Sequence, residues 1–512
     1  MKKHKKVLVF RRGDQNQQMM FPPAVEDFIP ADHPVRLVNN IINKLNLNFV
    51  YQLYDKDGAP AYDPKIMIKI LFFAYMQNIY SSRKIEASVK ENVNFMWLAA
   101  MQKPDHNTIN NFRSKRLQPV LKQIFSEIVI QLNQAGQLTL KDIYTDGTKI
   151  EANANKYTFV WGKAMNTQKG KMLERINALW DFTEAVTKQE QLETRPKTTE
   201  ELTPERVSEI IDQLNKSLEG FKIDSKKKAQ LRYAKKNYPD ALERYKKQEE
   251  KLGGRNSYSK TDKDATFMRM KEDHMGNGQL KPGYNWQIST NNQYIVNYST
   301  HQTAGDTTTL INHLLEFEKL YGSMPDQLTA DAGYGSEENY RFAEEHNIEA
   351  FIKYNYFHKE QKPKFKQDIK QTENLLYNEE QDCFYCPMGQ QMRKVGSKTS
   401  KTLTGFEQEI SFYRVQNCNG CPMRGKCHKG VGNRTIQVNH NLRRLRKAVR
   451  EKLISEEGLE KRSRRPIEPE AVFGNIKHNK NFRRLMLRGI KKVEIELGLM
   501  AIAHNLSKMA AQ

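Results

Sequence analysis

Two aspartates, each with glycine close behind it, have the setting in this chain that most suggests chemistry. Asp146 lies in "YTDGTKIEAN" at the end of the strand-like run "QLTLKDIYTD", and Asp331 ends the short apolar run "MPDQLTAD" before "AGYG". Taken alone, each aspartate is more commonly a turn or cap residue. Carboxylates at neighbouring strand ends of an open α/β sheet can, however, share divalent metal ions such as Mg²⁺. The pair therefore predicts a metal-dependent site at one edge of a sheet.

A third acid is expected from "RRPIEPEAVFGNIKHNK", which offers Glu468 and Glu470. The residue before a proline is pushed out of helical geometry, and Glu468 precedes Pro469. Proline is favoured at the first helical position, which places Glu470 in the first turn. Phe473 and Lys477 follow Glu470 at helical spacing, so one face would carry a carboxylate, an apolar anchor and a lysine. The alternative is an acid placed there by the helix dipole alone.

The cysteines form a second group with the spacing of metal ligands. All five fall in one segment, as Cys383, Cys386, Cys418, Cys421 and Cys427. The first four make two C-x2-C pairs, the usual frame of a tetrahedral structural zinc site, and Cys427 would be spare or replace one member. An iron–sulfur cluster and unliganded thiols are the alternatives. The spacing thus favours one structural Zn²⁺.

Charge points to the class of partner. The 512 residues carry 83 Lys and Arg against 60 Asp and Glu, a net charge of +23. A surplus of this size, clustered in runs such as "NLRRLRKAVREKL" and "EKRSRR", favours nucleic acid over a soluble basic protein without a polyanionic partner. The basic start "MKKHKKVLVF" has too short an apolar run for a secretory signal, and "IMIKILFFAYM" is short and broken by Lys69. We expect a cytoplasmic protein that does not bind membranes.

Residues 17–135 are predicted to be helical. Asp63-Pro64 is a helix-start signal, and the polar stretch "DHNTINNFRSKR" precedes a long amphipathic pattern. Short helices with Arg113, Lys115 and Arg116 beside them resemble a helix-turn-helix DNA reader, although small helical bundles with basic faces are common. This region is expected to contact DNA.

The remainder alternates between strands and helices. Strand character at residues 137–151 gives way to a long Lys/Glu/Leu-rich stretch, typical of a helical hairpin or antiparallel coiled coil. Strands return in "YNWQISTNNQYIVNYSTH", with Asn291-Asn292 as a two-residue turn. A helix capped by Asp306 or Thr307, the strand before Asp331, a helix opened by Ser336 and the strand "IEAFIKY" follow. This order predicts a mixed α/β sheet.

Five motifs in sequence order resemble those of the DDE transposases of bacterial insertion sequences: "TDGTKIEA", "KPGYNWQ", "TADAGYGSEEN", "EPEAVFGNIK" and "RGIKKVEIELGLMAIAHNLSKM". The similarity runs from about residue 17 to the C-terminus. It is to the branch with a helical N-terminal domain and a cysteine-bearing insertion. The resemblance implies a ribonuclease H-like catalytic core in which Asp146, Asp331 and Glu470 bind two Mg²⁺ or Mn²⁺ ions. It also implies that Lys477 contacts phosphate.

The chain departs from related families at one point of this motif. Those families often place a Tyr and an Arg at fixed spacing before the Glu. Here the basic residues are Arg464 and Arg465, and the Tyr position is not filled. These arginines are expected to lie along the phosphate backbone of DNA.

Six segments are expected from these patterns and from the resemblance. They are a helical DNA-binding domain (1–135), a first part of the core (136–160), a helical insertion (161–278), a second part of the core (279–356), a cysteine-rich insertion (357–440) and a C-terminal helical part of the core (441–512). The resemblance implies two-metal phosphodiester hydrolysis and strand transfer. The partners would be terminal inverted repeats and target DNA, with a homodimer or larger assembly on DNA. The alternatives are a metal-dependent nuclease that does not join ends and an inactive zinc-containing DNA-binding protein.

Overall fold

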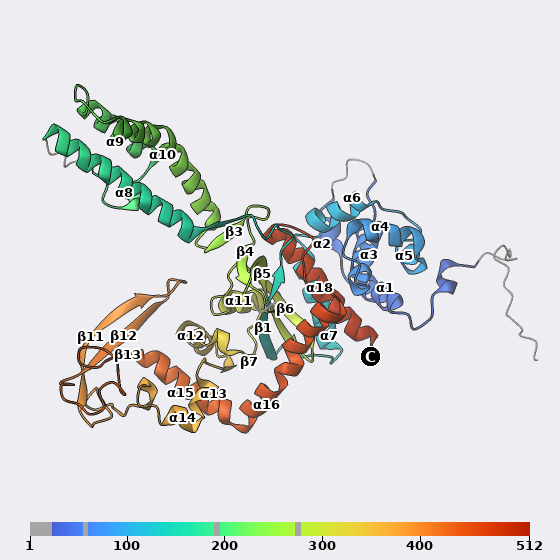
Figure 1. Ribbon diagram of the computed structural model, residues 1–512. Helices are drawn as coiled ribbons and strands as arrows, with labels where there is room; N and C mark the ends of the chain where they lie inside the picture. Colours follow the sequence, from blue (N-terminus) through green and yellow to red (C-terminus); the bar gives the residue numbers. More distant parts are fainter. Residues whose placement is uncertain (1–22, 55–59, 189–194, 272–277) are drawn as a thin grey trace, which may run out of the picture. The chain divides into compact units, whose positions relative to one another are not determined.

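The computed structural model describes residues 23–54, 60–188, 195–271 and 278–512 (Figure 1). The basic segment at residues 1–10 lies outside these ranges. Two compact units divide the chain, one ending at Phe112 and the other running from Arg113 to Gln512. No helix formed by the described residues is both long and apolar enough to cross a membrane.

The N-terminal unit is helical, as its sequence predicts. Its central helix begins where Asp63-Pro64 signals a start, with Asp63 Oδ1 accepting a hydrogen bond from the Lys65 backbone N at 2.8 Å. This helix is buried along nearly its whole length, so the shorter helices pack around it. The helices are α1 (Pro34–Lys44), α2 (Asn48–Tyr51), α3 (Pro64–Met76), α4 (Ser82–Glu91), α5 (Val93–Leu98) and α6 (His106–Asn111).

The second unit is a mixed α/β structure built on a six-stranded sheet. The strand order is β4-β5-β1-β7-β8. Strand β4 pairs with the first residues of β5, and β6 pairs with the residues of β5 that follow. Strands β1, β7 and β8 are parallel, whereas β4, β5 and β6 are joined by antiparallel pairing. The strands are β1 (Asp142–Glu151), β4 (Thr266–Arg269), β5 (Leu280–Asn291), β6 (Tyr294–His301), β7 (Gln327–Ala330) and β8 (Glu349–Ile352).

The predicted hairpin between β5 and β6 is present, but its turn is one residue further along. Asn291 is the last residue of β5, and the turn is made by Asn292 and Gln293, with φ of +48° and +59°. Two consecutive left-handed residues are the requirement of the hairpin turn that matches strand twist. The Asn291 side chain is used instead to accept a hydrogen bond from the Thr139 backbone N at 2.8 Å.

Helix α18 (Ile490–Ala510) packs on β6 and is buried on almost all sides. Helix α7 (Leu121–Gln134) packs beside α18, and α11 (Leu310–Tyr321) contacts both β6 and α7. Asn505 pairs with the backbone of Ile295 in β6 through both its amide oxygen and its amide nitrogen, each at 2.8 Å. Fully buried Glu496 accepts hydrogen bonds from the backbone N of Met486 and Leu487. These contacts satisfy backbone groups that would otherwise be buried without partners, so the late motif closes the core.

The long helical insertion contains three helices rather than a simple hairpin. Helices α8 (Gly162–Thr187), α9 (Pro204–Ser217) and α10 (Ser225–Leu252) lie side by side in Figure 1. They share an apolar core that includes Ile176, Trp180 and Val207. Short strands β2 (Phe159–Trp161) and β3 (Ser257–Ser259) pair at the base of this segment. The helices therefore have their own hydrophobic core, which a coiled-coil seam alone would not supply.

The cysteine-rich insertion folds around a five-stranded antiparallel sheet, a feature that the sequence pattern did not predict. The order is β13-β12-β11-β10-β9. Phe384, Tyr413 and Met392 are fully buried in its core. The strands are β9 (Tyr377–Asn378), β10 (Cys383–Tyr385), β11 (Gln391–Lys401), β12 (Glu407–Val415) and β13 (Thr435–Val438).

The α-helices between β7 and α18 flank this sheet in the sequence. They are α12 (Glu337–Glu345), α13 (Phe357–Glu360), α14 (Pro363–Lys366), α15 (His440–Ile454), α16 (Glu456–Arg464) and α17 (Ala471–Gly474).

Close packing of α18 on β6 gives a test of this core. A Cβ added at Gly498 would lie 2.3 Å from Tyr298 Oη and 2.8 Å from Leu121 Cδ2. We predict that Gly498→Leu lowers the free energy of unfolding by about 1–3 kcal/mol, because overpacking forces neighbours to shift. Gly170→Ala in α8, where a Cβ would meet nothing within 4 Å, should raise it by roughly 0.5–1 kcal/mol. Urea unfolding measures both changes, and equal behaviour of the two variants would contradict this packing.

Candidate functional site

The two aspartates lie side by side because of strand register. Strand β1 does not end at Asp146, as the Asp-Gly signal suggested, but continues to Glu151 in antiparallel pairing with β5. Its parallel pairing with β7, in contrast, stops at Thr145 opposite Ala330. Asp146 and Asp331 are the next residues on the two strands. The sheet therefore places both carboxylates at the carboxyl end of β7, where working groups of open α/β sheets gather.

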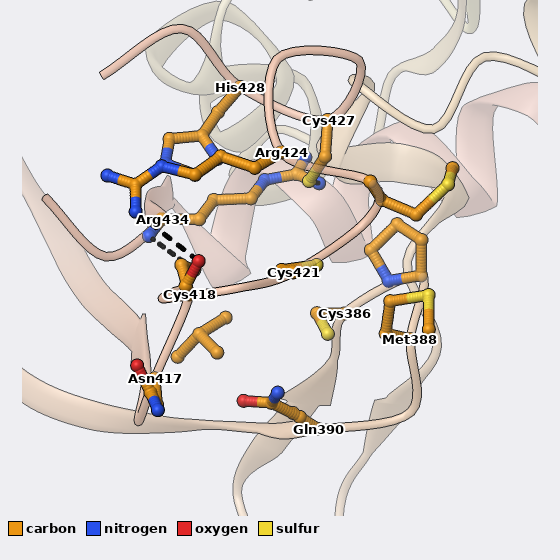
Figure 2. A pocket seen from close by; sticks show the side chains of 13 residues that line it. Cys386, Met388, Gln390, Asn417, Cys418, Cys421, Arg424, Cys427, His428 and Arg434 are labelled. Atoms are coloured by element: carbon orange, nitrogen blue, oxygen red, sulfur yellow. Dashed lines mark hydrogen bonds between the residues drawn. The ribbon is translucent and has the colours of Figure 1, made fainter. Parts of the chain in front are cut away.

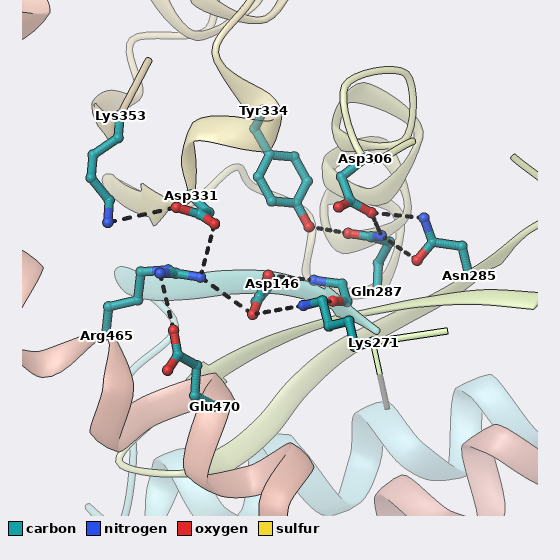
Figure 3. Close-up of polar contacts among 11 residues, drawn as sticks. Asp146, Lys271, Asn285, Gln287, Asp306, Asp331, Tyr334, Lys353, Arg465 and Glu470 are labelled. Atoms are coloured by element: carbon teal, nitrogen blue, oxygen red, sulfur yellow. Dashed lines mark hydrogen bonds and ion pairs between the residues drawn. The ribbon is translucent and has the colours of Figure 1, made fainter. Parts of the chain in front are cut away.

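A single guanidinium bridges these aspartates and Glu470. Arg465 Nη2 lies 3.3 Å from Asp146 Oδ2 and 3.5 Å from Asp331 Oδ2, and Arg465 Nη1 lies 3.1 Å from Glu470 Oε1 (Figure 3). The Arg465 side chain is buried, whereas the side chains of Asp331 and Glu470 are about half-exposed. Three acids from distant parts of the chain thus converge on one positive charge.

Two lysines complete the charge balance of the site. Lys271 Nζ lies 3.9 Å from Asp146 Oδ2, and Lys353 Nζ lies 3.6 Å from Asp331 Oδ1. With Arg465, three basic groups contact the three carboxylates (Figure 3). Mutual repulsion of the acids is therefore offset within the protein itself.

Helix α16 is fastened to the two strands that carry the aspartates. Lys461 Nζ donates to Asp142 Oδ2 at the start of β1 and to Gln327 Oε1 at the start of β7, both at 2.6 Å. Because Arg465 and Glu470 directly follow this helix, the two contacts hold them near the strand ends. In the sequence, Lys461 stands out only as part of the basic run "EKRSRR", which does not indicate contact with the two strands.

The helical path through Glu470 differs from the one the sequence predicts. The chain does not begin a helix at Pro469; it continues from α16 into a π-helical turn, Pro466–Glu470, then α17 and a second π-helical turn, Asn475–Asn479. Glu468 points to the β5–β6 turn, where Oε2 accepts a hydrogen bond from the Gln293 backbone N at 2.9 Å, and it is 7% exposed. Phe473 packs on Trp286 with ring centroids 5.9 Å apart. Of the two glutamates, Glu470 is the one that joins the aspartates.

The basic residues singled out in the sequence have different surroundings. Lys477 and Arg113 are buried, at 6% and 3% exposed, and Arg113 lies close enough to Glu496 to act against the burial that raises the pKa of that acid. Lys115 and Arg116 are exposed. Arg464 is half-exposed, with Nε 3.5 Å from Glu460 Oε1. As the protein stands, Lys477 and Arg113 are not surface groups, because the π-helical turns and the core around α18 enclose them.

A polar network beside Asp146 was missed by sequence reasoning. Asp306 Oδ1 accepts hydrogen bonds from Asn285 Nδ2 at 2.7 Å and Gln287 Nε2 at 3.0 Å. Tyr334 donates its hydroxyl to Gln287 (Figure 3). A Cβ at Gly147 would lie 2.2 Å from Gln287 Nε2, so any larger residue there would have to displace the Gln287 side chain from this network. The glutamine and asparagine alternate along β5 in "YNWQ", and this period-two spacing was the available signal.

Burial and charge act in opposite directions on the aspartates. Burial raises the pKa of Asp146 above its ordinary value, although Lys271 and Arg465 favour its ionised form. At Asp331 partial burial also acts to raise the pKa, but Arg465, the Ala332 backbone N–H and Lys353 together hold it below its ordinary value. The protein therefore disfavours the ionised form of Asp146 and favours the ionised form of Asp331.

The cysteines divide between a shared pocket and a separate position. Cys386, Cys418, Cys421 and Cys427 line one pocket together with His428 and Arg434 (Figure 2). Cys383 is buried in β10, where its Sγ contacts Gln381 Oε1 at 3.7 Å, and it does not line that pocket. Within the described ranges, no three His, Cys, Asp or Glu side chains are grouped so as to hold a metal ion as they stand. This holds also for Asp146, Asp331 and Glu470, whose carboxylates are separated by the guanidinium of Arg465.

Comparison with known families gives two matches. The family described as "Transposase DDE domain" matches residues 385–510, and the family described as "Transposase domain (DUF772)" matches residues 23–115. Comparison with curated proteins and with solved structures gave no match. Glu470 lies within the first match, whereas Asp146 and Asp331 lie outside both.

The fold is mixed α/β, and three acids that are far apart in the sequence contact one arginine beside the end of β7. The fold and the site therefore define an α/β protein with an acidic site at the sheet edge. The two family matches support a DDE transposase of an insertion sequence. The family resemblance expected from the sequence motifs is thereby confirmed.

The opposite pKa shifts of the aspartates predict opposite effects on stability in metal-free buffer. A raised folded-state pKa means that ionised Asp146 destabilises the fold at neutral pH. Its favourable contribution is fully present below the unfolded pKa and is lost as the pH rises through the folded pKa. Asp146→Asn should therefore raise the Tm at pH 7 in EDTA, and the gain should vanish as the pH falls toward 4. Asp331 has a lowered pKa, so Asp331→Asn should lower the Tm at pH 7 and lose this effect as acid protonates the wild-type carboxyl. Changes of the same sign in both variants would contradict the assigned electrostatics.

Proposed function

We propose that the protein is a DNA transposase that cuts phosphodiester bonds at the ends of an insertion sequence and joins them to target DNA. The observation that carries the proposal is the convergence of Asp146, Asp331 and Glu470 on Arg465 from three separate segments. The strand order and directions of the central sheet support a ribonuclease H-like core. The transposase family matches support DNA as the partner.

The three carboxylates suit Mg²⁺ or Mn²⁺ by donor chemistry. Carboxylate oxygens are the protein ligands that these ions prefer, and the three groups already converge on one cationic side chain. Asp146, Asp331 and Glu470 would hold the ions. Two bound ions would activate the attacking water or DNA 3′-hydroxyl and stabilise the leaving oxygen.

The basic residues of the site have two uses in this proposal. Without metal, Arg465, Lys271 and Lys353 neutralise the acids and keep them together. If the acids held metal ions, the same three side chains would be available to contact phosphate oxygens of DNA. Arg465 is suited to this exchange because its fork fits carboxylate and phosphate alike. The exposed residues Lys115 and Arg116, which precede α7 in the chain, would add further phosphate contacts.

The deciding experiment is a strand-transfer assay with labelled DNA taken from both flanks of this gene. Cut ends joined to a target plasmid would support the transposase. Nicked ends without joined products would favour the nuclease alternative. DNA binding without cutting, unaffected by changes to the acids, would favour the inactive DNA-binding alternative.

Substitution of the acids tests their assignment. We predict that Asp146→Asn, Asp331→Asn and Glu470→Gln each reduce cleavage at least about 100-fold, because metal-bound stabilisation of the transition state is worth several kcal/mol. DNA binding in gel-shift assays should persist in all three variants. Glu468→Gln is the matched control, since a glutamine oxygen can still accept the Gln293 hydrogen bond. An inactive Glu468 variant beside an active Glu470 variant would reverse the assignment.

Salt dependence tests nucleic acid as the partner. The logarithm of the affinity should fall linearly with the logarithm of salt concentration, by about 0.9 for each phosphate contact, because binding releases counterions. The variant Lys115→Ala/Arg116→Ala should have a slope smaller by roughly 2 and weaker binding to every DNA sequence. A flat salt response of the wild-type protein would exclude the basic surface as the source of binding.

A further inference from the structure

The loop at residues 416–434, which joins β12 to β13, contains no helix or strand. Loops of this length without secondary structure are uncommon in compact domains and usually have a separate function or support. Its two ends are tied by Asn433, which donates to the Gln416 carbonyl at 2.7 Å and accepts from the Cys418 backbone N at 3.0 Å. These contacts close the base of the loop. Within it, Arg424 donates to the carbonyls of Cys418 and Val431, and His428 Nε2 lies 2.9 Å from the Gly432 carbonyl oxygen.

Thiols gather where this loop meets the turn after β10. Cys418, Cys421 and Cys427 come from the loop, and Cys386 comes from the β10–β11 turn (Figure 2). Cys383 begins β10 and contacts Gln381 instead. The lining of this pocket therefore differs from the two C-x2-C pairs: Cys427 is part of it and Cys383 is not.

The backbone around these cysteines makes tight turns. The Gly389 backbone N donates to the Cys386 carbonyl at 2.8 Å, and Gly389 has φ of +77°. Gly420, between Cys418 and Cys421, has φ of +69°. Left-handed glycines let a short segment reverse, so cysteines before and after such a turn can face one point.

A buried cation lies beside the thiols. Arg434 is 5% exposed, its Nη1 lies 2.8 Å from Cys427 Sγ, and its backbone N donates to Cys418 Sγ at 3.4 Å. Its other guanidinium hydrogen bonds go to the carbonyls of Ile369 and Lys370, at 2.9 Å each. A buried charge is costly unless a charge of opposite sign compensates it. Gln371, the Lys370 backbone N–H and, to a smaller extent, Arg434 lower the pKa of the Asp368 carboxyl, so this acid compensates part of the arginine's charge. Four thiolates around a divalent ion carry a net negative charge and would compensate it further.

We propose that Cys386, Cys418, Cys421 and Cys427 bind one Zn²⁺ ion, with Arg434 as the counter-charge in its outer shell. Binding draws the four thiols together from their present positions around the pocket and staples the loop to the β10–β11 turn. Four sulfur ligands close the tetrahedral shell and leave no position for water, so the ion is structural. This site is independent of the DNA-cleavage chemistry, and it can be present or absent whatever the outcome of the strand-transfer assay.

Metal content of the purified full-length chain tests the ligand set. About one zinc per chain is expected in the wild type. Each of Cys386→Ser, Cys418→Ser, Cys421→Ser and Cys427→Ser should weaken zinc binding more than about 100-fold, since loss of even an outer-shell partner costs about 10–100-fold. Cys383→Ser is the matched control and should keep its zinc. His428→Ala, which removes a neighbour in the same pocket, should also keep it.

Cobalt replacement keeps the test decisive if the serine variants fold poorly. Wild-type protein stripped with a chelator and titrated with Co²⁺ should develop the intense sulfur-to-cobalt absorption of a tetrahedral thiolate site, and Cys383→Ser should give the same spectrum. Zinc should then displace the cobalt at one equivalent. Loss of zinc in Cys383→Ser or His428→Ala, retention in Cys427→Ser, or a metal-free wild type whose loop resists protease equally with and without added zinc would overturn the proposal.

Discussion

The parallel pairing of β1 with β7 is the constraint on which the acidic site depends. Because this pairing ends at Thr145 and Ala330, the following aspartates must lie next to one another. A shift of the register by one residue would turn one carboxylate to the opposite face of the sheet. Antiparallel pairing of β1 with β5 continues past Asp146, so that aspartate is held in a rigid strand rather than in a mobile turn.

Charge compensation within the protein explains how three carboxylates can lie around one point. Arg465 contacts all three, and Lys461 fixes the helix before it to the first residues of both aspartate-bearing strands. The acid that comes last in the sequence is thereby attached to the same sheet as the first two. The five-stranded insertion between Asp331 and Glu470 has its own apolar core, which lets the chain leave the central sheet and return without disturbing it.

Two kinds of positive charge serve this protein differently. The overall surplus of +23 acts at long range on any polyanion and depends on salt. Buried arginines act over a few ångströms on named partners: Arg465 on the carboxylates and Arg434 on the sulfur of Cys427. Sequence composition reveals the first kind. The second kind depends on burial, because a guanidinium removed from water must find a partner.

The sequence by itself determined the mixed α/β class, the helical N-terminal unit and the transposase family. Periodicity, caps such as Asp63 and Ser336, and ordered motifs are local signals that do not depend on distant contacts. The motifs also favoured Glu470 over Glu468 as the third acid. Only the tertiary structure decided that Arg465 stands between Glu470 and the aspartates, that Glu468 is turned to the β5–β6 turn, and that Cys427 rather than Cys383 shares a pocket with the other thiols. The physical reason is that π-helical turns and strand register set side-chain direction, and both are fixed by packing between segments far apart in the chain.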